Sequence, residues 1–174
     1  MGQGTFIITK RIEIDAAHRV PGHLGKCRGL HGHRYVVEAQ CEGTLADQGS
    51  ESGMVLDFGF LKEELIDVVD SQCDHSMILW IKDPLAQLMC SVSVRMERNV
   101  SELGYHAVQT DFGQIYLIAT VPTAENLAEH WFSRLVGRVF ARSGGRAKLV
   151  ALRVWETPTA SAIYAEADGN IRAY

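Results

Sequence analysis

The sequence predicts an α+β fold in which an antiparallel sheet carries two helices on one face. Stretches toward the two ends of the chain alternate apolar and polar side chains, and two other stretches repeat apolar side chains at helical spacing. The order is two strands, a helix, an insertion at about residues 81–121, a second helix and two more strands. We expect residues 1–174 to form a single domain, since this length is enough for one core.

The two N-terminal strands, expected at residues 5–17 and 33–42, carry the main chemical signal. Because side chains alternate along a strand, His18 shares a face with the apolar residues of the first strand. His31 and His33 share a face with the apolar residues of the second. The apolar residues in phase with the histidines are Ile8, Ile12, Ile14, Tyr35 and Val37. The two strands thus place three histidines on the covered side of the sheet.

Three imidazoles are the ligand set of a catalytic zinc site, which leaves one coordination position free for water or substrate. A single histidine in phase with apolar residues is more often a hydrogen-bonded core residue. Three of them, with Cys27 in the segment between the strands, favour a metal centre. The residue types leave iron, nickel and copper open beside zinc.

The two main helices are marked by capping residues. Asp57 is expected to cap a helix over residues 58–71, and Thr123 a helix that ends at Arg142. Each helix repeats apolar residues on one face, which is the face expected to cover the sheet.

The insertion has a weaker pattern. Asp83 followed by Pro84 predicts one helix that reaches Glu97 or Arg98, and residues 114–119 predict a short strand. Nothing else in this segment indicates chemistry, so we expect an elaboration of the domain.

Further candidate residues lie near the strand ends. Strands are expected at residues 148–156 and 162–166, and Glu156 lies in phase with the apolar face of the first of them. A carboxylate placed there needs a hydrogen-bond donor from the protein or from a ligand, or it stays protonated. Asp74 and His75 follow the first helix in a loop, where their side chains could converge on a shared neighbour, although such pairs are usually surface residues.

Composition narrows the class of partner. The net charge of −4 and the pI near 6.0 provide no basic field for nucleic acid or an anionic membrane, so we expect a small-molecule partner. The sequence shows no long apolar run and no signal sequence, which predicts a soluble, cytoplasmic protein. The four cysteines form no CxxC pair and are expected to be reduced thiols.

Taken together, six motifs in order resemble the 6-pyruvoyl-tetrahydropterin synthase superfamily. The motifs are Ala16-Ala17-His18-Arg19, Cys27-x3-His31-Gly32-His33, Gly53-Met54-Val55-Leu56-Asp57-Phe58, Asp74-His75, Pro122-Thr123-Ala124-Glu125-Asn126 and Trp155-Glu156-Thr157. The spacing of Cys27 four residues before His31 is similar to the branch of 6-carboxy-5,6,7,8-tetrahydropterin synthases, which serve queuosine biosynthesis. The resemblance covers nearly the whole chain apart from the insertion.

The resemblance implies the tunnelling fold (T-fold), in which subunits pool their sheets into a barrel. Such proteins are commonly hexamers of two stacked trimers with active sites between subunits. It also implies a zinc ion held by His18, His31 and His33 and a substrate, 7,8-dihydroneopterin triphosphate. By the same resemblance, the proton acceptor is Cys27, the relay is Asp74 with His75, and the residue that anchors the pterin ring is Glu156.

The implied reaction is an internal redox rearrangement with loss of triphosphate and, in the 6-carboxy branch, carbon–carbon cleavage that releases acetaldehyde. Two alternatives stay open: a sibling lyase that stops at 6-pyruvoyl-tetrahydropterin or trims the side chain to a hydroxymethyl group, and a non-catalytic metal-binding protein. The candidate cations for the triphosphate are Arg19, Lys26, Arg28 and Arg34.

Overall fold

A seven-stranded sheet in the order β4-β5-β3-β1-β2-β6-β7 runs through the protein. The structure is a computed structural model and describes residues 4–166. The strands are β1 (Phe6–His18), β2 (His31–Gly43), β3 (Ser76–Trp80), β4 (Tyr105–Thr110), β5 (Gly113–Ile118), β6 (Ala147–Thr157) and β7 (Ala160–Tyr164). The helices are α1 (Phe58–Leu65), α2 (Ser71–Cys73), α3 (Pro84–Cys90), α4 (Val94–Leu103) and α5 (Ala124–Arg142), with short helical turns η1 (Lys26–Arg28) and η2 (Ile66–Asp70).

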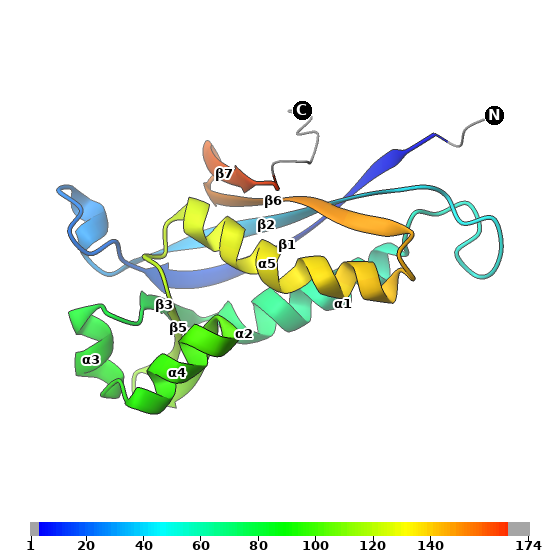
Figure 1. Cartoon of the computed structure of the whole chain (residues 1–174). Helices are drawn as coiled ribbons and strands as arrows, with labels where there is room; N and C mark the ends of the chain where they lie inside the picture. Colours follow the sequence, from blue (N-terminus) through cyan, green and yellow to red (C-terminus); the bar gives the residue numbers. More distant parts are fainter. Residues whose placement is uncertain (1–3, 167–174) are drawn as a thin grey trace.

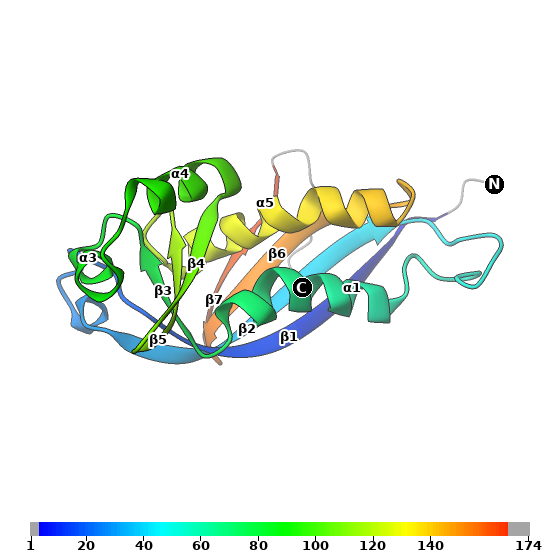
Figure 2. The ribbon, with the colours of Figure 1, turned by 90° about the horizontal axis from the view of Figure 1, so that it is seen from below.

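Two helices cover one face of the sheet, as the apolar spacing predicted. Figures 1 and 2 show α1 and α5 on the same side of β1, β2 and β6. Their buried faces, which include Leu61, Leu65, Trp131 and Leu135, pack on the covered side of these strands in the main core. The opposite face of this part of the sheet carries the polar residues of the alternating pattern.

The predicted caps of both helices are confirmed. The Asp57 carboxylate accepts a hydrogen bond from the Gly59 N–H at 2.7 Å, and the Thr123 hydroxyl accepts one from the Asn126 N–H at 3.3 Å. The first helix departs from regular α geometry, because the π-helical turn η2 follows α1 before the short α2.

The sheet is mixed, which corrects the prediction of a wholly antiparallel one. The pairs β1–β2, β2–β6 and β6–β7 are antiparallel, whereas β3 runs parallel to β1 and β5 parallel to β3. The insertion therefore extends the main sheet, with β4 and β5 added beside β3. Alternation along a strand indicates its buried face but not the direction of its neighbour, so the sequence pattern could not reveal this pairing.

The single helix predicted in the insertion is two helices, α3 and α4. Ser91 adopts a left-handed conformation (φ 48°) that ends α3, and the Ser93 side chain caps α4 by accepting from the Met96 N–H. These helices cover a second core built from residues such as Leu79, Ile81, Ala86, Val100, Ile115 and Leu117. The predicted short strand is confirmed as β5.

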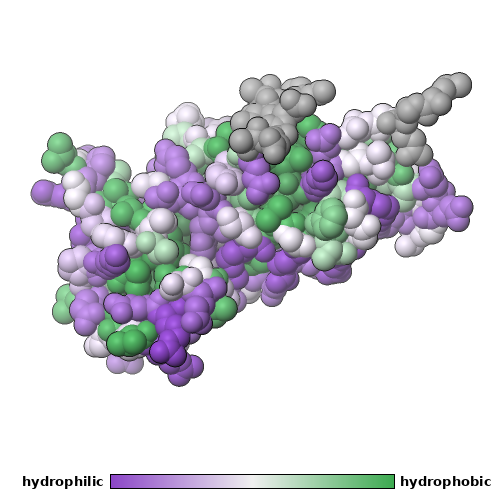
Figure 3. Space-filling model, viewed as in Figure 1, coloured by the Kyte–Doolittle hydropathy of each residue, from purple (hydrophilic) through white to green (hydrophobic). Residues whose placement is uncertain are grey.

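The surface seen in the view of Figure 1 mixes hydrophilic and hydrophobic residues, without one dominant patch (Figure 3). No helix in the part of the chain that the structure describes is both long and apolar enough to span a bilayer.

A partly buried polar cluster joins the insertion to α5. The Tyr116 hydroxyl on β5 accepts a hydrogen bond from the Arg134 guanidinium at 2.6 Å and lies 2.9 Å from the His130 Nε2. Since the hydroxyl proton is free to point at the imidazole, His130 acts as an acceptor and is neutral. Burial, together with the nearby Arg134 charge, lowers the pKa of His130 to about 4.

This shift predicts that His130 makes the fold sensitive to acid. An unfolded histidine has a pKa near 6.5, so as the pH falls from about 6.5 to about 4 the unfolded chain takes up a proton that the folded chain does not. The free energy of unfolding then falls by up to about 3 kcal/mol through this residue. Urea titrations at pH 7 and at pH 4.5 give the free energy of unfolding at each pH. Between these two pH values, His130→Gln is expected to lose less of this free energy than the parent protein. Equal losses in the two proteins would contradict this assignment.

Candidate active site

Three histidines meet at one end of the β1–β2 pair. The strand register pairs His18 with His31 and Ala16 with His33, so all three imidazoles emerge on the covered face. One ring nitrogen from each lies within 4.8 Å of those of the others, and this is the spacing of a possible metal site. The predicted set of His18, His31 and His33 is therefore brought together.

The hydrogen bonds of two of these rings leave their metal-binding nitrogens free. Nδ1 of His18 lies 2.7 Å from the Pro122 carbonyl oxygen, and Nδ1 of His31 lies 2.9 Å from the Gly29 carbonyl oxygen. A carbonyl only accepts, so each Nδ1 carries the proton and donates it. The two Nε2 atoms, which lie 3.1 Å apart, then both present lone pairs. Lone pairs that face each other at this distance need a shared cation or a proton.

The third ring fits the same interpretation. Nε2 of His33 is buried and makes no hydrogen bond within residues 4–166. Burial lowers the pKa of both His18 and His33, with the neighbouring imidazoles contributing in the same direction, so both rings are held neutral as metal ligands must be. The residues present therefore fit a metal ion, and the backbone carbonyls that accept from Nδ1 orient the ligands.

The parallel strands of the insertion supply one of these orienting groups. Strands β1, β3 and β5 run in the same direction, so their carboxyl ends lie at one edge of the sheet. His18 ends β1, and Pro122 follows β5 at that edge, which explains how its carbonyl reaches the His18 ring. The side chain of Tyr35 packs from within the core against the rings of His18 and His33.

Cys27 and Glu156 share a pocket of about 250 Å³ with His18. Cys27 lies on η1 and is partly buried, while Glu156 lies near the end of β6. An oxygen of Glu156 lies 3.4 Å from the His18 Nε2 and 3.8 Å from the His33 Nε2. The pocket thus combines a thiol, a carboxylate and a possible metal ligand.

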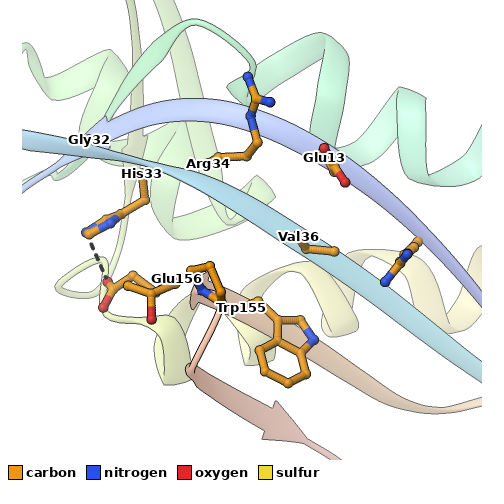
Figure 4. A pocket seen from close by; sticks show the side chains of 10 residues that line it. Glu13, Gly32, His33, Arg34, Val36, Trp155 and Glu156 are labelled. Carbon is orange, nitrogen blue, oxygen red and sulfur yellow. Dashed lines mark ion pairs between the residues drawn. The ribbon is translucent and has the colours of Figure 1, made fainter.

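Glu156 also borders a larger pocket of about 600 Å³ that His33 lines with it. Figure 4 shows Glu156 facing the His33 ring at one end, with the side chains of Trp155 and Val36 farther along the pocket. Arg34 and Glu13, from the polar face of the sheet, also line it. Glu156 therefore lines two cavities.

Asp74 and His75 form a pair but do not reach Cys27 in this chain. Nδ1 of His75 lies 2.8 Å from an Asp74 oxygen, which raises the pKa of His75. Partial burial opposes ionisation of Asp74, yet hydrogen bonds from the Asp15 N–H and from His75 hold its pKa below the usual range. The His75 ring is 80% exposed and lines a separate pocket, of which Cys27 is not a part.

Sequence reasoning missed three residues of this region. His23 and Glu125 line the Cys27 pocket, and the Asp83 side chain lies 3.1 Å from Arg19, the residue after His18. His23 sits in a loop without periodicity, so no pattern singled it out. Asp83 was recognised only as a helix cap.

Comparison with known proteins identifies the family. The family model described as 6-pyruvoyl tetrahydropterin synthase matches residues 7–167. The chain belongs to the 6-pyruvoyl tetrahydropterin synthase family. A relative from Rickettsia felis named 6-carboxy-5,6,7,8-tetrahydropterin synthase is 35% identical over 150 residues, which cover 86% of this chain and 93% of the relative. One of the same name from Haemophilus influenzae is 30% identical over 161 residues, 92% of this chain and 99% of the relative.

Solved structures support the same fold. An uncharacterized protein from Wolinella succinogenes superposes with a TM-score of 0.70 at 22% identity, over 93% of this chain and 98% of that one. The 6-pyruvoyl tetrahydropterin synthase of Caenorhabditis elegans superposes with a TM-score of 0.59 at 23% identity, over 95% of this chain and 99% of that one. The predicted α+β T-fold of the 6-pyruvoyl tetrahydropterin synthase family is thus confirmed for the single chain.

The histidine geometry predicts one divalent metal site per chain. Titration of metal-free protein with Co²⁺ is expected to give the visible spectrum of a low-coordinate nitrogen site. Replacement of His33 by Ala removes one of three ligands and is expected to weaken binding by at least about 100-fold. His106→Gln serves as the matched control, because His106 lies on β4 with Asn99 as its partner. Equal Co²⁺ affinity of both variants would count against the site.

Proposed function

We propose that this protein is a zinc-dependent lyase. It converts 7,8-dihydroneopterin triphosphate into 6-carboxy-5,6,7,8-tetrahydropterin, with release of acetaldehyde and triphosphate, in queuosine biosynthesis. The observation that carries the proposal is the pocket in which Cys27 and Glu156 stand beside the histidine cluster. The names of the Rickettsia felis and Haemophilus influenzae relatives support the 6-carboxy product over the sibling products.

The three histidines would hold the zinc ion through their unprotonated ring nitrogens. When bound, zinc supplies Lewis acidity that acidifies a neighbouring hydroxyl and stabilises enolate-like charge. Cys27 would take up the proton that leaves the substrate carbon. The thiol acts as a base only as thiolate, and Lys26 and Arg28 are its neighbours in the sequence.

Glu156 would orient the substrate. It lines two cavities, and its carboxylate can accept two N–H bonds from the amino-pyrimidine edge of a pterin. Such a ligand provides the donors that a carboxylate at the end of an apolar strand face needs.

The four candidate cations for the triphosphate differ in availability. Arg19 forms an ion pair with buried Asp83, and Arg34 forms a two-bonded ion pair with Asp15. Lys26 and Arg28 are exposed on η1 and have no ion-pair partner within residues 4–166. They are therefore the side chains we assign to the phosphate tail.

The relay formed by Asp74 and His75 would act in a neighbouring copy. In one chain His75 lies in a different pocket from Cys27, and its ring is exposed. An assembly in which each site combines Cys27 of one chain with His75 of another reconciles both roles. We therefore propose a homo-oligomer with shared sites, built as a hexamer of two trimers.

The first test is product identification. Zinc-loaded protein is incubated with 7,8-dihydroneopterin triphosphate, and the products are identified by mass spectrometry. We expect 6-carboxytetrahydropterin together with acetaldehyde. A 6-pyruvoyl or 6-hydroxymethyl product would assign the sibling activity, and an unchanged substrate with bound metal would support the non-catalytic metal-binding protein.

Replacement of Cys27 by Ala separates chemistry from metal binding. Loss of the proton acceptor is expected to reduce kcat by about 10² to 10⁴-fold, while zinc content stays unchanged. Cys90→Ser is the matched control, because Cys90 is a partly exposed cysteine of the insertion outside the pocket. Retention of full turnover by Cys27→Ala would remove the thiol from the mechanism.

Shared sites predict complementation between inactive variants. Cys27→Ala and His75→Ala are each expected to be inactive as pure proteins. When the two are unfolded, mixed and refolded together, some sites combine an intact Cys27 with an intact His75, so activity should return to a fraction of the parent value. Mixing without subunit exchange is the control. A refolded mixture that stays inactive would show that each chain builds its site alone.

A further inference from the structure

We propose that Asp83 of the insertion is a positioning residue for Cys27, acting through Arg19. The proposal rests on the proposed role of the Cys27 pocket and adds a function for the insertion. It starts from the Asp83 carboxylate, which is fully buried. Asp83 lies 56 residues after Cys27 in the sequence.

The Asp83 carboxylate is held rigidly. One oxygen accepts from the Leu85 N–H at 2.8 Å as the cap of α3, and the Asp83 N–H donates to the Trp80 carbonyl at 2.8 Å. Its side chain is 0% exposed, and its other oxygen has no hydrogen-bond partner within the described residues. A buried carboxylate in this state needs a counter-ion.

Arg19 supplies that charge. Its Nε lies 3.1 Å from the free Asp83 oxygen, and this nitrogen likewise has no hydrogen-bond partner in residues 4–166. The two groups meet because β1 and β3 are parallel, so Arg19, just after β1, and Asp83, just after β3, emerge at the same edge. The ion pair therefore joins the insertion to the strand end that carries His18.

The residue after Arg19 holds Cys27. The Val20 N–H donates to the Cys27 carbonyl at 2.8 Å, and the Val20 carbonyl accepts from the His23 N–H at 3.1 Å. Val20, the residue next to Arg19, is thus hydrogen-bonded to His23 and to Cys27 of the loop 19–30. With Arg19 anchored on Asp83, Val20 is held in place, and the thiol is kept at the pocket that it shares with Glu156.

The experiment compares two aspartates with the same capping role. Asp83→Asn keeps a side-chain oxygen for the helix cap but removes the charge that holds Arg19. Asp57→Asn makes the same change at the cap of α1, where the carboxylate is exposed and has no ion pair within the described residues. Both are made in a Cys90→Ser background, because the remaining cysteines, Cys41 and Cys73, are buried.

Two readouts need no substrate. Hydrogen exchange of the Val20 amide and alkylation of Cys27 by iodoacetamide are expected to be about tenfold faster in Asp83→Asn and unchanged in Asp57→Asn. Turnover should show a lower kcat with KM within about threefold. The double variant Arg19→Met with Asp83→Asn should show the same exchange rate, alkylation rate and kcat as Asp83→Asn alone, because both variants remove the same ion pair.

Unchanged exchange and alkylation in Asp83→Asn would overturn the proposal, as would additive effects in the double variant. If Asp83→Asn does not fold, Arg19→Gln tests the same link from the partly exposed side, with the same expected acceleration. A protein that shows the acceleration but no turnover in the parent would sustain the positioning role and refute the lyase.

Discussion

The pairing of β1 with β2 is the constraint on which the site depends. Its register sets His18 opposite His31 and Ala16 opposite His33, so two strands present three ring nitrogens within 4.8 Å. Because strand side chains alternate with a period of two, a slip of one residue would turn one histidine set to the other face. Apolar residues in phase with the histidines, such as Tyr35, are buried. A slip would expose them to water, so their burial prevents it. The same alternation that builds the core therefore assembles the ligand set.

The phase of the histidines was predictable because it is a local property of each strand. Cys27 and Glu156 were predictable as chemistry but not as neighbours, since a loop and a distant strand end meet only through the sheet order. The parallel pairing of β3 and β5 could not be seen in the sequence, because it depends on how helices carry the chain back across the sheet.

That parallel pairing changes what the insertion does. It brings Pro122 to the His18 ring and Asp83 to Arg19, both at the carboxyl ends of neighbouring strands. The sequence pattern predicted Asp83 as a cap, and Arg19 was a candidate cation for the triphosphate that the family resemblance implied. The ion pair between them occupies Arg19 and leaves Lys26 and Arg28, the exposed sequence neighbours of Cys27, as the cations for the proposed triphosphate.

Charge in the pocket follows from the same contacts. With the imidazoles neutral, as burial favours for His18 and His33, the carboxylate that lies beside them is Glu156, and Glu125 lines the same pocket. A divalent cation held by these imidazoles would add positive charge beside the two carboxylates. The exposed cations on η1 add to this local field, so a chain with a net charge of −4 can still offer an anionic substrate a positive site. The overall charge therefore does not favour broad polyanion binding, and it does not oppose binding of the small triphosphate of the proposed substrate.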